Sequence, residues 1–275
     1  MSERVLYVSD LDGTLLRNDK TISPFSVNTI NALIEKGVLF TYATARSYYT
    51  ACEVSRGLCP QIPLVLYNGT FIAKPSGEII CTCSFAQNQI REALSELQEA
   101  EISPLVYSFF NEREHFSYDK ERITRGIQSF LDDHPNDPRC NPTNKDLLTH
   151  GEIFHITCID DREILEPLYE RFKNDYSCVL YLDSYTGEWW LEIMPMEATK
   201  ANAIRTLAKM LECDRIICFG DGVNDISMLE VADELYAVAN AHEELIKRAT
   251  GVIDNNESDG VAKYLLKRLN DEKKD

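Results

Sequence analysis

The sequence has few basic residues. Its 275 residues include 28 Lys and Arg against 45 Asp and Glu, which gives a formal net charge of -17 at pH 7. Nucleic acids and anionic membranes bind proteins through basic surfaces, so this imbalance disfavours both as partners. It does not exclude a small phosphorylated substrate, because a metal ion and a few cationic side chains can reverse the field inside a cleft.

Long hydrophobic runs are also missing. No segment approaches the roughly 18 apolar residues of a membrane-spanning helix, and residues 1–4 lead directly into an apolar run rather than a signal peptide. Nine cysteines are present, but none forms a Cys-x-x-Cys pair, and most lie in apolar segments such as 216–219. We therefore predict a cytoplasmic protein with reduced, buried cysteines and no zinc site.

Two acidic segments remain to be explained. Asp10 and Asp12 follow the apolar run 5–9, and Asp221 and Asp225 follow another apolar run at 215–219. Carboxylates at the ends of buried strands repel one another and are costly to desolvate, so they usually surround a hard cation. Magnesium prefers oxygen ligands and is commonly held by one or two carboxylates beside a phosphate. The pattern therefore predicts a Mg2+ site.

Other interpretations of these segments fit less well. A calcium loop that begins at Asp10 would place Thr21 where such a loop requires a Glu. Gly220 and Gly222 match part of a dinucleotide fingerprint, but Asp225 occupies the place of its third glycine. Because aspartate can accept a phosphoryl group covalently, the segments favour phosphoryl transfer, with Asp10 as nucleophile and Asp12 as general acid and base.

Strand-like and helical patterns alternate in the first and last parts of the chain. This alternation is typical of an α/β protein, and we predict a doubly wound, Rossmann-like parallel-sheet core formed by residues 1–84 and 194–275. Residues 85–193 have a sheet-and-helix pattern of their own and are predicted to form an inserted α+β cap domain. The core is then discontinuous in sequence.

The local patterns predict the individual elements. Helices are expected at 24–36, 87–99, 121–133, 162–173 and 199–211, from 224 onward, and at the end of the chain. Strands are expected at 5–9, 38–43, 64–67, 105–110, 114–118, 153–159, 178–182, 188–194, 215–219 and 235–238, with a hairpin at 71–80 and a last strand before the closing helix. Residues 134–142 are predicted to be a loop.

This layout predicts that distant segments meet. In an open doubly wound sheet, ligands bind beyond the carboxyl ends of the strands, and Asp10, Thr44 and Asp221 each follow a predicted strand. Lys200 lies in the first turn of a predicted helix, where its ammonium group and the helix N-terminus both attract anions. Alone, Thr44 would be taken for a helix cap and Lys200 for a surface residue.

Read in order, four segments resemble the haloacid dehalogenase superfamily of phosphotransferases. They are Asp10-Leu11-Asp12-Gly13-Thr14, then Ala43-Thr44-Ala45-Arg46, then Lys200, then Gly220 to Asp225. The long insert, Asn68-Gly69 and Val238-Ala239-Asn240-Ala241 are similar to the Cof-type phosphatases, which carry a large C2-type cap. One departure is Ala45, where that family usually has glycine; alanine keeps the backbone N–H, so the change concerns loop conformation.

The resemblance implies roles for these residues. The catalytic residues would be Asp10, which forms an aspartyl phosphate, and Asp12. The Mg2+ site would comprise Asp10, the main-chain carbonyl of Asp12, and Asp221, with Asn224 and Asp225 close behind. The substrate phosphate would be bound by Thr44, Ala45, Arg46, Lys200 and Asn224.

The predicted function is a Mg2+-dependent phosphatase that acts on a small phosphorylated metabolite, with a sugar phosphate favoured by resemblance. Two alternatives stay open: a phosphomutase on the same scaffold, and a non-catalytic phosphate-sensing protein in which Asp10 is phosphorylated and held. In the cap, Trp189 and Trp190 are candidates to flank the leaving group, but adjacent strand residues face opposite sides, so at most one does. Arg113 and His115 are weaker candidates. We expect a monomer or weak dimer.

Overall fold

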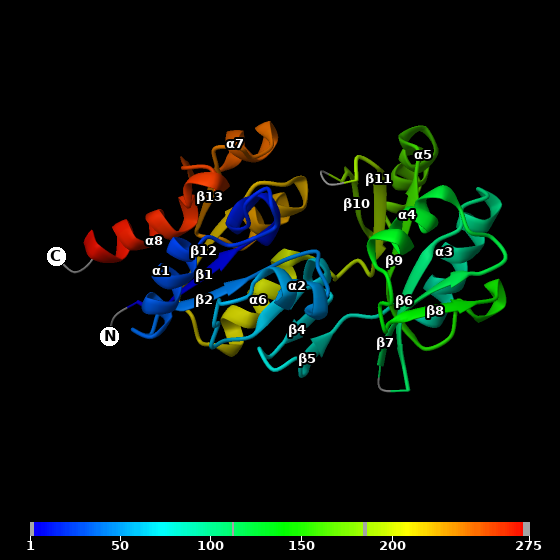
Figure 1. Cartoon of the computed structure of the whole chain (residues 1–275), viewed down its shortest axis with the longest axis horizontal. Coiled ribbons are helices and arrows are strands. Elements are labelled where there is room, and N and C mark those ends of the chain that lie inside the picture. Colours follow the sequence, from blue (N-terminus) through cyan, green and yellow to red (C-terminus); the bar gives the residue numbers. More distant parts are fainter. Residues whose placement is uncertain (1–2, 112, 184–185, 272–275) are drawn as a thin grey trace. The chain divides into compact units, whose positions relative to one another are not determined.

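A computed structural model describes residues 3–111, 113–183 and 186–271. The chain divides into two compact units, one formed by residues up to 82 and from 199, and the other by residues 83–198 (Figure 1). We call them the core unit and the inserted unit. The predicted domain boundaries after residue 84 and before residue 194 lie close to these divisions, although the sheet of the inserted unit continues to Met194.

The core unit is built on a five-stranded sheet in the order β14-β13-β12-β1-β2, in which every neighbouring pair is parallel. Its strands are β1 (Val5–Ser9), β2 (Leu39–Tyr42), β12 (Arg215–Gly220), β13 (Glu234–Val238) and β14 (Gly251–Ile253). The apolar run of β1 is almost fully buried, as expected of a central parallel strand. The carboxyl ends of β1 and β12 are therefore neighbours.

Helices cover both faces of this sheet. They are α1 (Pro24–Ile34), α2 (Tyr48–Val54), α6 (Lys200–Met210), α7 (Glu243–Arg248) and α8 (Gly260–Asp271). Leu6 and Val8 pack in one apolar cluster with Leu207 of α6, while Phe219 contacts Tyr264 of α8, with ring centroids 5.3 Å apart. Since side chains alternate across a strand, α6 and α8 lie on opposite faces, which confirms the predicted doubly wound fold.

A small antiparallel sheet adjoins the parallel one. It contains β3 (Leu64–Leu66), β4 (Phe71–Ala73) and β5 (Ile79–Thr82), in that order. A single parallel bridge between Ala43 and Val65 links it to the end of β2. The predicted third strand therefore exists, but it pairs mainly with the hairpin that follows it and not with the parallel sheet.

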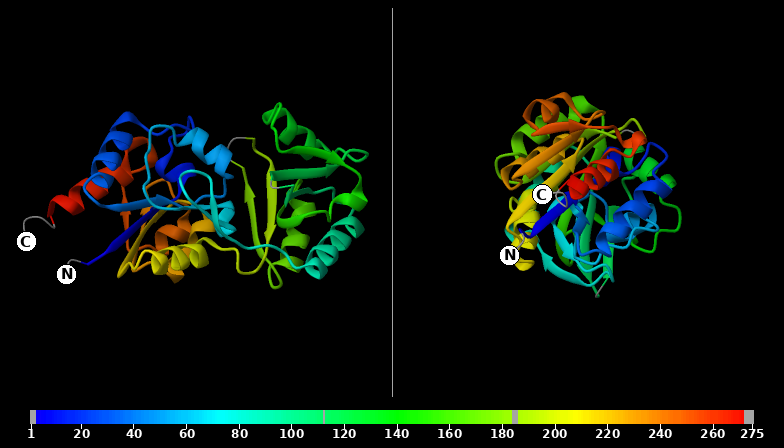
Figure 2. Two further views of the ribbon diagram at one scale, coloured as in Figure 1. Left: turned by 90° about the horizontal axis from the view of Figure 1, so that it is seen from below. Right: turned by 90° about the vertical axis from the view of Figure 1, so that its left-hand side faces the viewer.

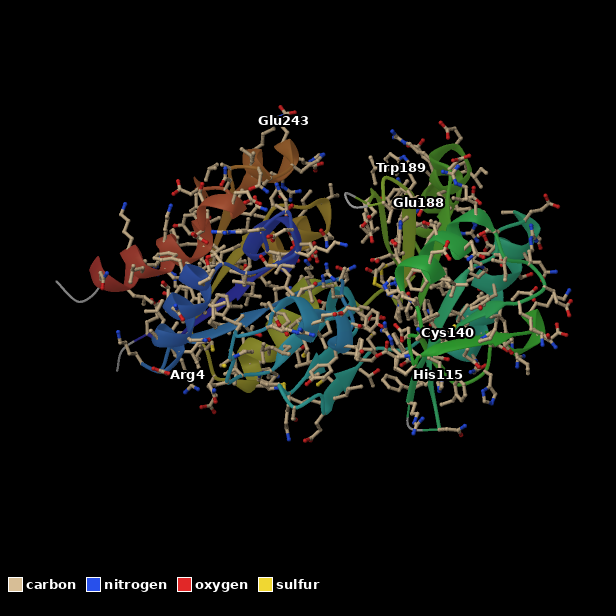
Figure 3. The ribbon with its side chains drawn as sticks, viewed as in Figure 1. Arg4, His115, Cys140, Glu188, Trp189 and Glu243 are labelled. Carbon is tan, nitrogen blue, oxygen red and sulfur yellow. The ribbon has the colours of Figure 1, made fainter. Side chains whose placement is uncertain are left out.

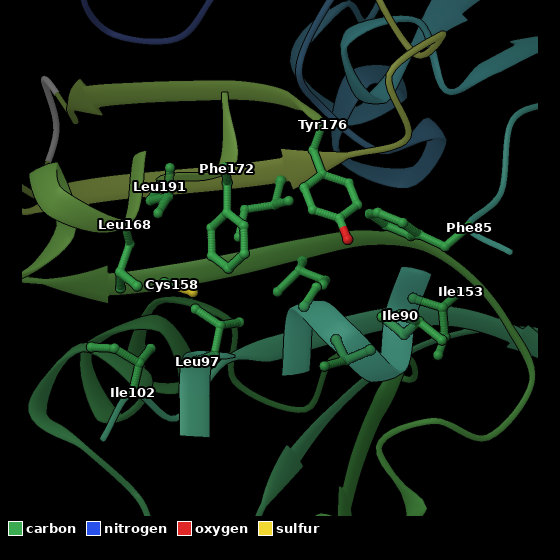
Figure 4. Packing of buried hydrophobic residues seen from close by; sticks show 14 of the residues in the cluster. Phe85, Ile90, Leu97, Ile102, Ile153, Cys158, Leu168, Phe172, Tyr176 and Leu191 are labelled. Atoms are coloured by element: carbon green, nitrogen blue, oxygen red, sulfur yellow. The ribbon is translucent and has the colours of Figure 1, made fainter. Parts of the chain in front are cut away.

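The inserted unit has a six-stranded sheet in the order β10-β11-β9-β6-β7-β8. Its strands are β6 (Leu105–Phe110), β7 (Arg113–Asp119), β8 (Cys140–Thr143), β9 (Glu152–Asp160), β10 (Ser177–Leu182) and β11 (Trp189–Met194). Its helices are α3 (Gln87–Glu99), α4 (Arg125–Asp133) and α5 (Arg162–Phe172). Helices α3 and α5 contribute Leu97 and Phe172 to a cluster with Leu191 of the sheet (Figure 4). Helix α4 packs on the other face, where Phe130 contacts Trp190.

Several element predictions were wrong in detail. Helix α4 begins at Arg125 and not at 121, because the hydroxyl of Thr124 accepts the N–H of Ile127 and caps the helix there. The predicted loop 134–142 includes all of β8 but its last residue, and this strand is hard to recognise because Pro142 interrupts it. Residues Val223–Glu230 form 3-10 turns instead of an α-helix. The short helices α2 and α7 were not predicted.

Figure 2 shows the ribbon from two further sides, and the first and last described segments both belong to the core unit. Among the described residues, none of the helices combines the length and the apolar character needed to cross a bilayer.

Candidate active site

Lys200 joins two of the predicted site carboxylates. Its Nζ lies 2.6 Å from Oδ1 of Asp10 and 2.7 Å from Oδ1 of Asp225, and all three side chains are buried. Asp10 directly follows β1, where its N–H donates to the carbonyl of Phe219 on β12. Lys200 is the first residue of α6, after the N-cap Thr199. The alternation of strands and helices thus places residues from distant segments in contact.

Asp225 also shapes the second acidic segment. Its Oδ2 accepts the backbone N–H groups of Asp221 and Gly222, each at 2.9 Å, while its Oδ1 contacts Lys200. Both carboxylate oxygens are therefore engaged, and the side chain is completely buried. Asp225 holds the turn after β12 in place in addition to contributing charge.

The first acidic segment is fitted closely against the second. The hydroxyl of Thr14 donates to Oδ1 of Asp221 at 2.7 Å. Gly13 has a φ of 73°, and a Cβ at this position would lie 2.2 Å from Oδ2 of Asp221. Only glycine satisfies both the backbone conformation and the contact, so the Gly in Asp-Leu-Asp-Gly-Thr is required by geometry.

Three carboxylates form the candidate metal site. Asp10, Asp221 and Asp225 each offer an oxygen, and these atoms lie within 4.8 Å of one another. Burial raises the pKa of Asp10 well above its usual value, and neighbouring carboxylates add to the effect against the opposing charge of Lys200. Burial, followed by the charge of Asp225, raises the pKa of Asp221 to about 7.

With Lys200 as their buried cation, Asp10 and Asp221 still have raised pKa values. Burial alone would lower the pKa of Lys200, but Asp10 and Asp225 outweigh it and raise that pKa, so the ammonium group is charged. An all-oxygen donor set suits a hard cation, and a divalent ion favours the ionised form of the acids around it. The residues therefore fit Mg2+.

Asp12 is bound by Arg46 and lies outside the carboxylate group of the metal site. The guanidinium group of Arg46 donates from Nε to Oδ2 at 2.7 Å and from its terminal nitrogen to Oδ1 at 2.6 Å. Such a paired contact fixes the carboxylate both in position and in orientation. Arg46, which we predicted as a phosphate ligand, here contacts the predicted general acid and base; no pattern in the sequence indicates this pairing.

Thr44 begins the turn that carries Ala45 and Arg46. Its side chain is fully buried, and its Oγ1 accepts the N–H of Arg46 at 3.1 Å. Its carbonyl accepts the N–H of Asn68, which brings the end of β3 to this turn. Ala45 lies between Thr44 and Arg46 and is partly exposed.

Asn68 is a site neighbour that sequence reasoning did not assign. Its Oδ1 accepts from Nδ2 of Asn224 at 3.2 Å, so it orients a predicted ligand. Asn68 and Gly69 have φ values of 52° and 102°, and a Cβ on Gly69 would lie 2.1 Å from the carbonyl oxygen of Thr199. The Asn-Gly pair is the sequence feature that could have indicated this tight loop, because both residues tolerate positive φ. The positive φ values let the loop pack against the start of α6.

The two tryptophans of the inserted unit face opposite sides of its sheet, as their alternation requires. Trp189 packs against the cluster under α3 and α5 and lies beneath the guanidinium of Arg162, 4.8 Å from the ring centroid. Trp190 contacts Phe130 on the other face. His115 stacks on Phe110 in the β6–β7 hairpin, with centroids 3.9 Å apart. Figure 3 shows Trp189 and His115 on their strands.

Residues 7–265 match the family of haloacid dehalogenase-like hydrolases, which is nearly the whole chain. The chain belongs to this family. The 5-amino-6-(5-phospho-D-ribitylamino)uracil phosphatase YitU of Bacillus subtilis is 28% identical over 268 residues, covering 94% of this chain and 96% of that protein.

Solved structures agree with this haloacid dehalogenase-like fold. A Thermotoga maritima protein is 26% identical with a TM-score of 0.76, and the match covers 97% of each chain. A HAD subclass IIB sugar phosphatase has a TM-score of 0.74 at 19% identity, covering 95% of this chain and 97% of that one, and shows the fold alone. Family and relatives together confirm the predicted enzyme class, a phosphoric monoester hydrolase.

Proposed function

We propose that this hydrolase is a Mg2+-dependent phosphatase that cleaves a small phosphate monoester through an aspartyl-phosphate intermediate on Asp10. The observation that carries the proposal is the contact of Asp10 with Lys200 beside Asp221 and Asp225. It supplies a nucleophile, a fixed cation and an oxygen-rich cation site in one place. Phosphoryl transfer depends mainly on such positioning and charge stabilisation.

In this mechanism a carboxylate oxygen of Asp10 attacks phosphorus in line, and the bond to the leaving alcohol oxygen breaks as the new O–P bond forms. Asp12 donates a proton to the leaving oxygen, then takes one from the water that hydrolyses the aspartyl phosphate. Arg46 donates to both oxygens of Asp12 and so positions the proton acceptor; one of these contacts must open for the earlier step, in which an oxygen of Asp12 carries the proton given to the leaving oxygen. The products are the free alcohol and inorganic phosphate, and Asp10 is regenerated.

The remaining predicted residues surround the transferring group in this proposal. Mg2+ would be held by Asp10, the main-chain carbonyl of Asp12 and Asp221, with Asn224 and Asp225 nearby, and would neutralise charge on the phosphate oxygens. Phosphate contacts are assigned to the hydroxyl of Thr44, the amide of Ala45, Lys200 and Asn224. The buried positions of Thr44 and Lys200 at ends of neighbouring elements support this assignment.

A phosphorylated sugar is the proposed substrate class. The Bacillus subtilis relative is named for a phosphoribityl compound, and a structural neighbour is named a sugar phosphatase. Both names describe phosphate esters of polyhydroxylated carbon chains. The acidic composition favours such a small partner over nucleic acid or membrane. The proposal places the enzyme in the cytosol, as a monomer or weak dimer.

The test is phosphate release from a panel of sugar phosphates, nucleotides and vitamin phosphates, with Mg2+ and with EDTA. Asp10→Asn should lower turnover by about a thousandfold or more, because the covalent step is lost. Asp19→Asn, at an exposed carboxylate that binds Thr21 locally, is the control and should keep wild-type turnover. Near wild-type turnover in Asp10→Asn would overturn the proposal. An isomerised sugar or a long-lived phosphoprotein would instead identify a mutase or a phosphate sensor.

A further inference from the structure

The segment between β13 and α7 contacts both acidic segments of the active site. The side-chain amide of Asn240 donates from Nδ2 to the carbonyl of Gly13 at 2.7 Å. Two residues later, the backbone N–H of His242 donates to the carbonyl of Asp221 at 2.8 Å. One short stretch of chain thus holds the carbonyl of Gly13, one residue beyond Asp12, and the carbonyl of Asp221.

The amide of Asn240 is itself held in one orientation. Its Oδ1 accepts the backbone N–H of Asn256 at 3.1 Å, which leaves Nδ2 directed at Gly13. Asn256 is buried, and its own Nδ2 donates to the carbonyl of Leu16 at 3.0 Å. Two side-chain amides therefore bind the chain at Gly13, inside the first acidic segment, and at Leu16, two residues beyond it. Only an amide provides both an acceptor and a donor in this geometry, whereas a carboxylate of the same shape has no donor.

These contacts oppose a real repulsion. The segments that carry Asp10 and Asp221 approach until Gly13 leaves no room for a Cβ against the carboxylate of Asp221. Like charges this close push the two segments apart. The Asn240 contact acts on the carbonyl of Gly13, in the peptide group that follows the one whose Asp12 carbonyl belongs to the proposed Mg2+ site. Because the two peptide groups share the Cα of Gly13, a shift of the Gly13 carbonyl would also move the proposed ligand.

We propose that Asn240, oriented by Asn256, is a positioning residue that sets the affinity for Mg2+ by fixing the Gly13 carbonyl, and with it the backbone at Gly13 to which the Asp12 carbonyl is joined. The inference rests on the proposed function, since it assumes that the Asp12 carbonyl, in the preceding peptide group, is a metal ligand. Groups that orient metal ligands commonly change affinity about 10- to 100-fold when removed. A contact that only stabilised the loop would lower the melting temperature and leave Mg2+ affinity unchanged.

The experiment measures Mg2+ binding to the purified full chain by calorimetry without substrate, together with thermal unfolding and phosphatase kinetics. Asn240→Asp keeps the acceptor for Asn256 but places a carboxylate oxygen against the carbonyl of Gly13. We expect the Mg2+ dissociation constant to rise about tenfold in Asn240→Asp and in Asn240→Ala. Turnover at saturating Mg2+ should fall less than the affinity.

The matched control is Asn255→Ala. The Asn255 side chain accepts the N–H of Ser258 in the same part of the fold and caps a local turn. This variant should lower the melting temperature while its Mg2+ constant stays at the wild-type value. Asn256→Asp keeps the backbone N–H that binds Asn240 but loses the donor to the carbonyl of Leu16. It should raise the Mg2+ dissociation constant by a smaller factor than Asn240→Asp. This variant also tests the proposal if the Asn240 variants fold poorly.

Wild-type Mg2+ constants in Asn240→Asp and Asn256→Asp would overturn the positioning role. This outcome would leave the proposed function intact. Loss of turnover in Asp10→Asn would still support the phosphatase mechanism even if the Asn240 variants bound Mg2+ with the wild-type constant. Conversely, an active Asp10→Asn enzyme would remove the phosphatase mechanism, and weakened Mg2+ binding in Asn240→Asp would still show that this amide positions the metal site.

Discussion

Each unit buries polar side chains beside a sheet, but the two clusters differ in how their charges are balanced. In the core unit, Lys200 faces Asp10 and Asp225, with Asp221 nearby, and burial raises the pKa of Asp10 and Asp221. In the inserted unit, Tyr181 donates to Glu192, and Arg139 binds two carboxylates.

The inserted unit also contains a buried histidine that is neutral. Burial lowers the pKa of His155 to about 3, and its Nε2 lies 3.1 Å from the hydroxyl of Thr157. The carboxylates of this cluster pair with Arg139 and Tyr181 of the same unit, although the buried Nε1 of Trp190 has no hydrogen-bond partner. The comparison indicates that burial of polar groups alone does not mark a site. Carboxylates whose pKa stays raised do: burial raises the pKa of Asp10 and Asp221, whereas the contacts with Arg139 outweigh burial and lower the pKa of Asp137.

The largest expected difference comes from replacing the buried cation of each cluster. Lys200→Met should lower kcat/KM by about a thousandfold, because it removes a fixed charge next to the nucleophile. Arg139→Met removes the partner of Glu114 and Asp137, so it should destabilise the protein by about 3 kcal/mol and leave the turnover of folded enzyme near wild type. Steady-state kinetics and urea unfolding measure the two effects.

Equal losses of turnover in both variants would break the distinction between the clusters. It would mean that the charges of the inserted unit take part in chemistry and not only in folding. A Lys200→Met variant that keeps turnover would instead remove the core cluster from the mechanism.

The sequence predicts the core cluster better than its surroundings. Asp10, Thr44 and Asp221 follow strands of one parallel sheet, and such strand ends meet at one edge whatever the loop details. The partners of these residues depend on those details. Arg46 reaches Asp12, and Asn240 reaches Gly13, through loops whose paths follow from long-range packing. No local spacing encodes such a contact.

The inserted unit shows the same limit at the level of strands. Helix α3 was predicted with the bounds that it has, because its apolar residues recur with a clear helical period. Strand β8 was missed because Cys140–Thr143 shows no alternation of apolar and polar residues. Its only β-branched residue is the last, Thr143. It forms because β7 offers an edge beside it in parallel register. Tertiary pairing, and not propensity, decides that strand.

A second comparison uses one glycine from each unit. A Cβ on Gly13 would lie 2.2 Å from a carboxylate oxygen of Asp221, and a Cβ on Gly126 would lie 2.2 Å from the carbonyl oxygen of Ile159. Gly13→Ala should weaken Mg2+ binding about tenfold, because it displaces a proposed ligand. Gly126→Ala should leave Mg2+ binding unchanged and destabilise the packing of α4 by about 1 to 3 kcal/mol.

Calorimetry with Mg2+ and urea unfolding distinguish these outcomes. If Gly126→Ala weakens Mg2+ binding as much as Gly13→Ala, the metal site is not confined to the core cluster. If Gly13→Ala binds Mg2+ normally, the close fit of the two acidic segments has no role in holding the ion.

The effect that is smallest per step of the measurement, at most about 1.4 kcal/mol per pH unit, is a difference in pH dependence between the units. The pKa of the Asp221 carboxyl group is 3.8 in an unfolded chain and about 7 in the folded, metal-free protein. Between pH 3.8 and about pH 7, the folded state therefore keeps a proton that the unfolded chain has released. The contribution of Asp221 to stability is therefore lost as the pH rises toward 7. The effect of His155 on stability has the opposite pH dependence, because folding lowers its pKa from 6.5 to about 3. Below pH 6.5 the unfolded chain binds a proton that the folded state does not, so stability is lost as the pH falls.

Urea unfolding in EDTA at several pH values tests both signs. His155→Gln should remove a slope of at most about 1.4 kcal/mol per pH unit on the acid side. Asp221→Asn should reduce the fall in unfolding free energy as the pH rises toward 7, because it removes the titrating group. Mg2+ should reduce the same fall in the wild type, because a bound cation favours the ionised carboxylate. Both tryptophans, Trp189 and Trp190, lie in the inserted unit, so their fluorescence follows that unit, while circular dichroism follows the whole chain. If Mg2+ abolished the loss of stability below pH 6.5 that fluorescence reports, the ion would be acting on the inserted unit around His155. In that case the metal-dependent behaviour would not be confined to the carboxylates of the core unit, and the contrast between the two units would be wrong.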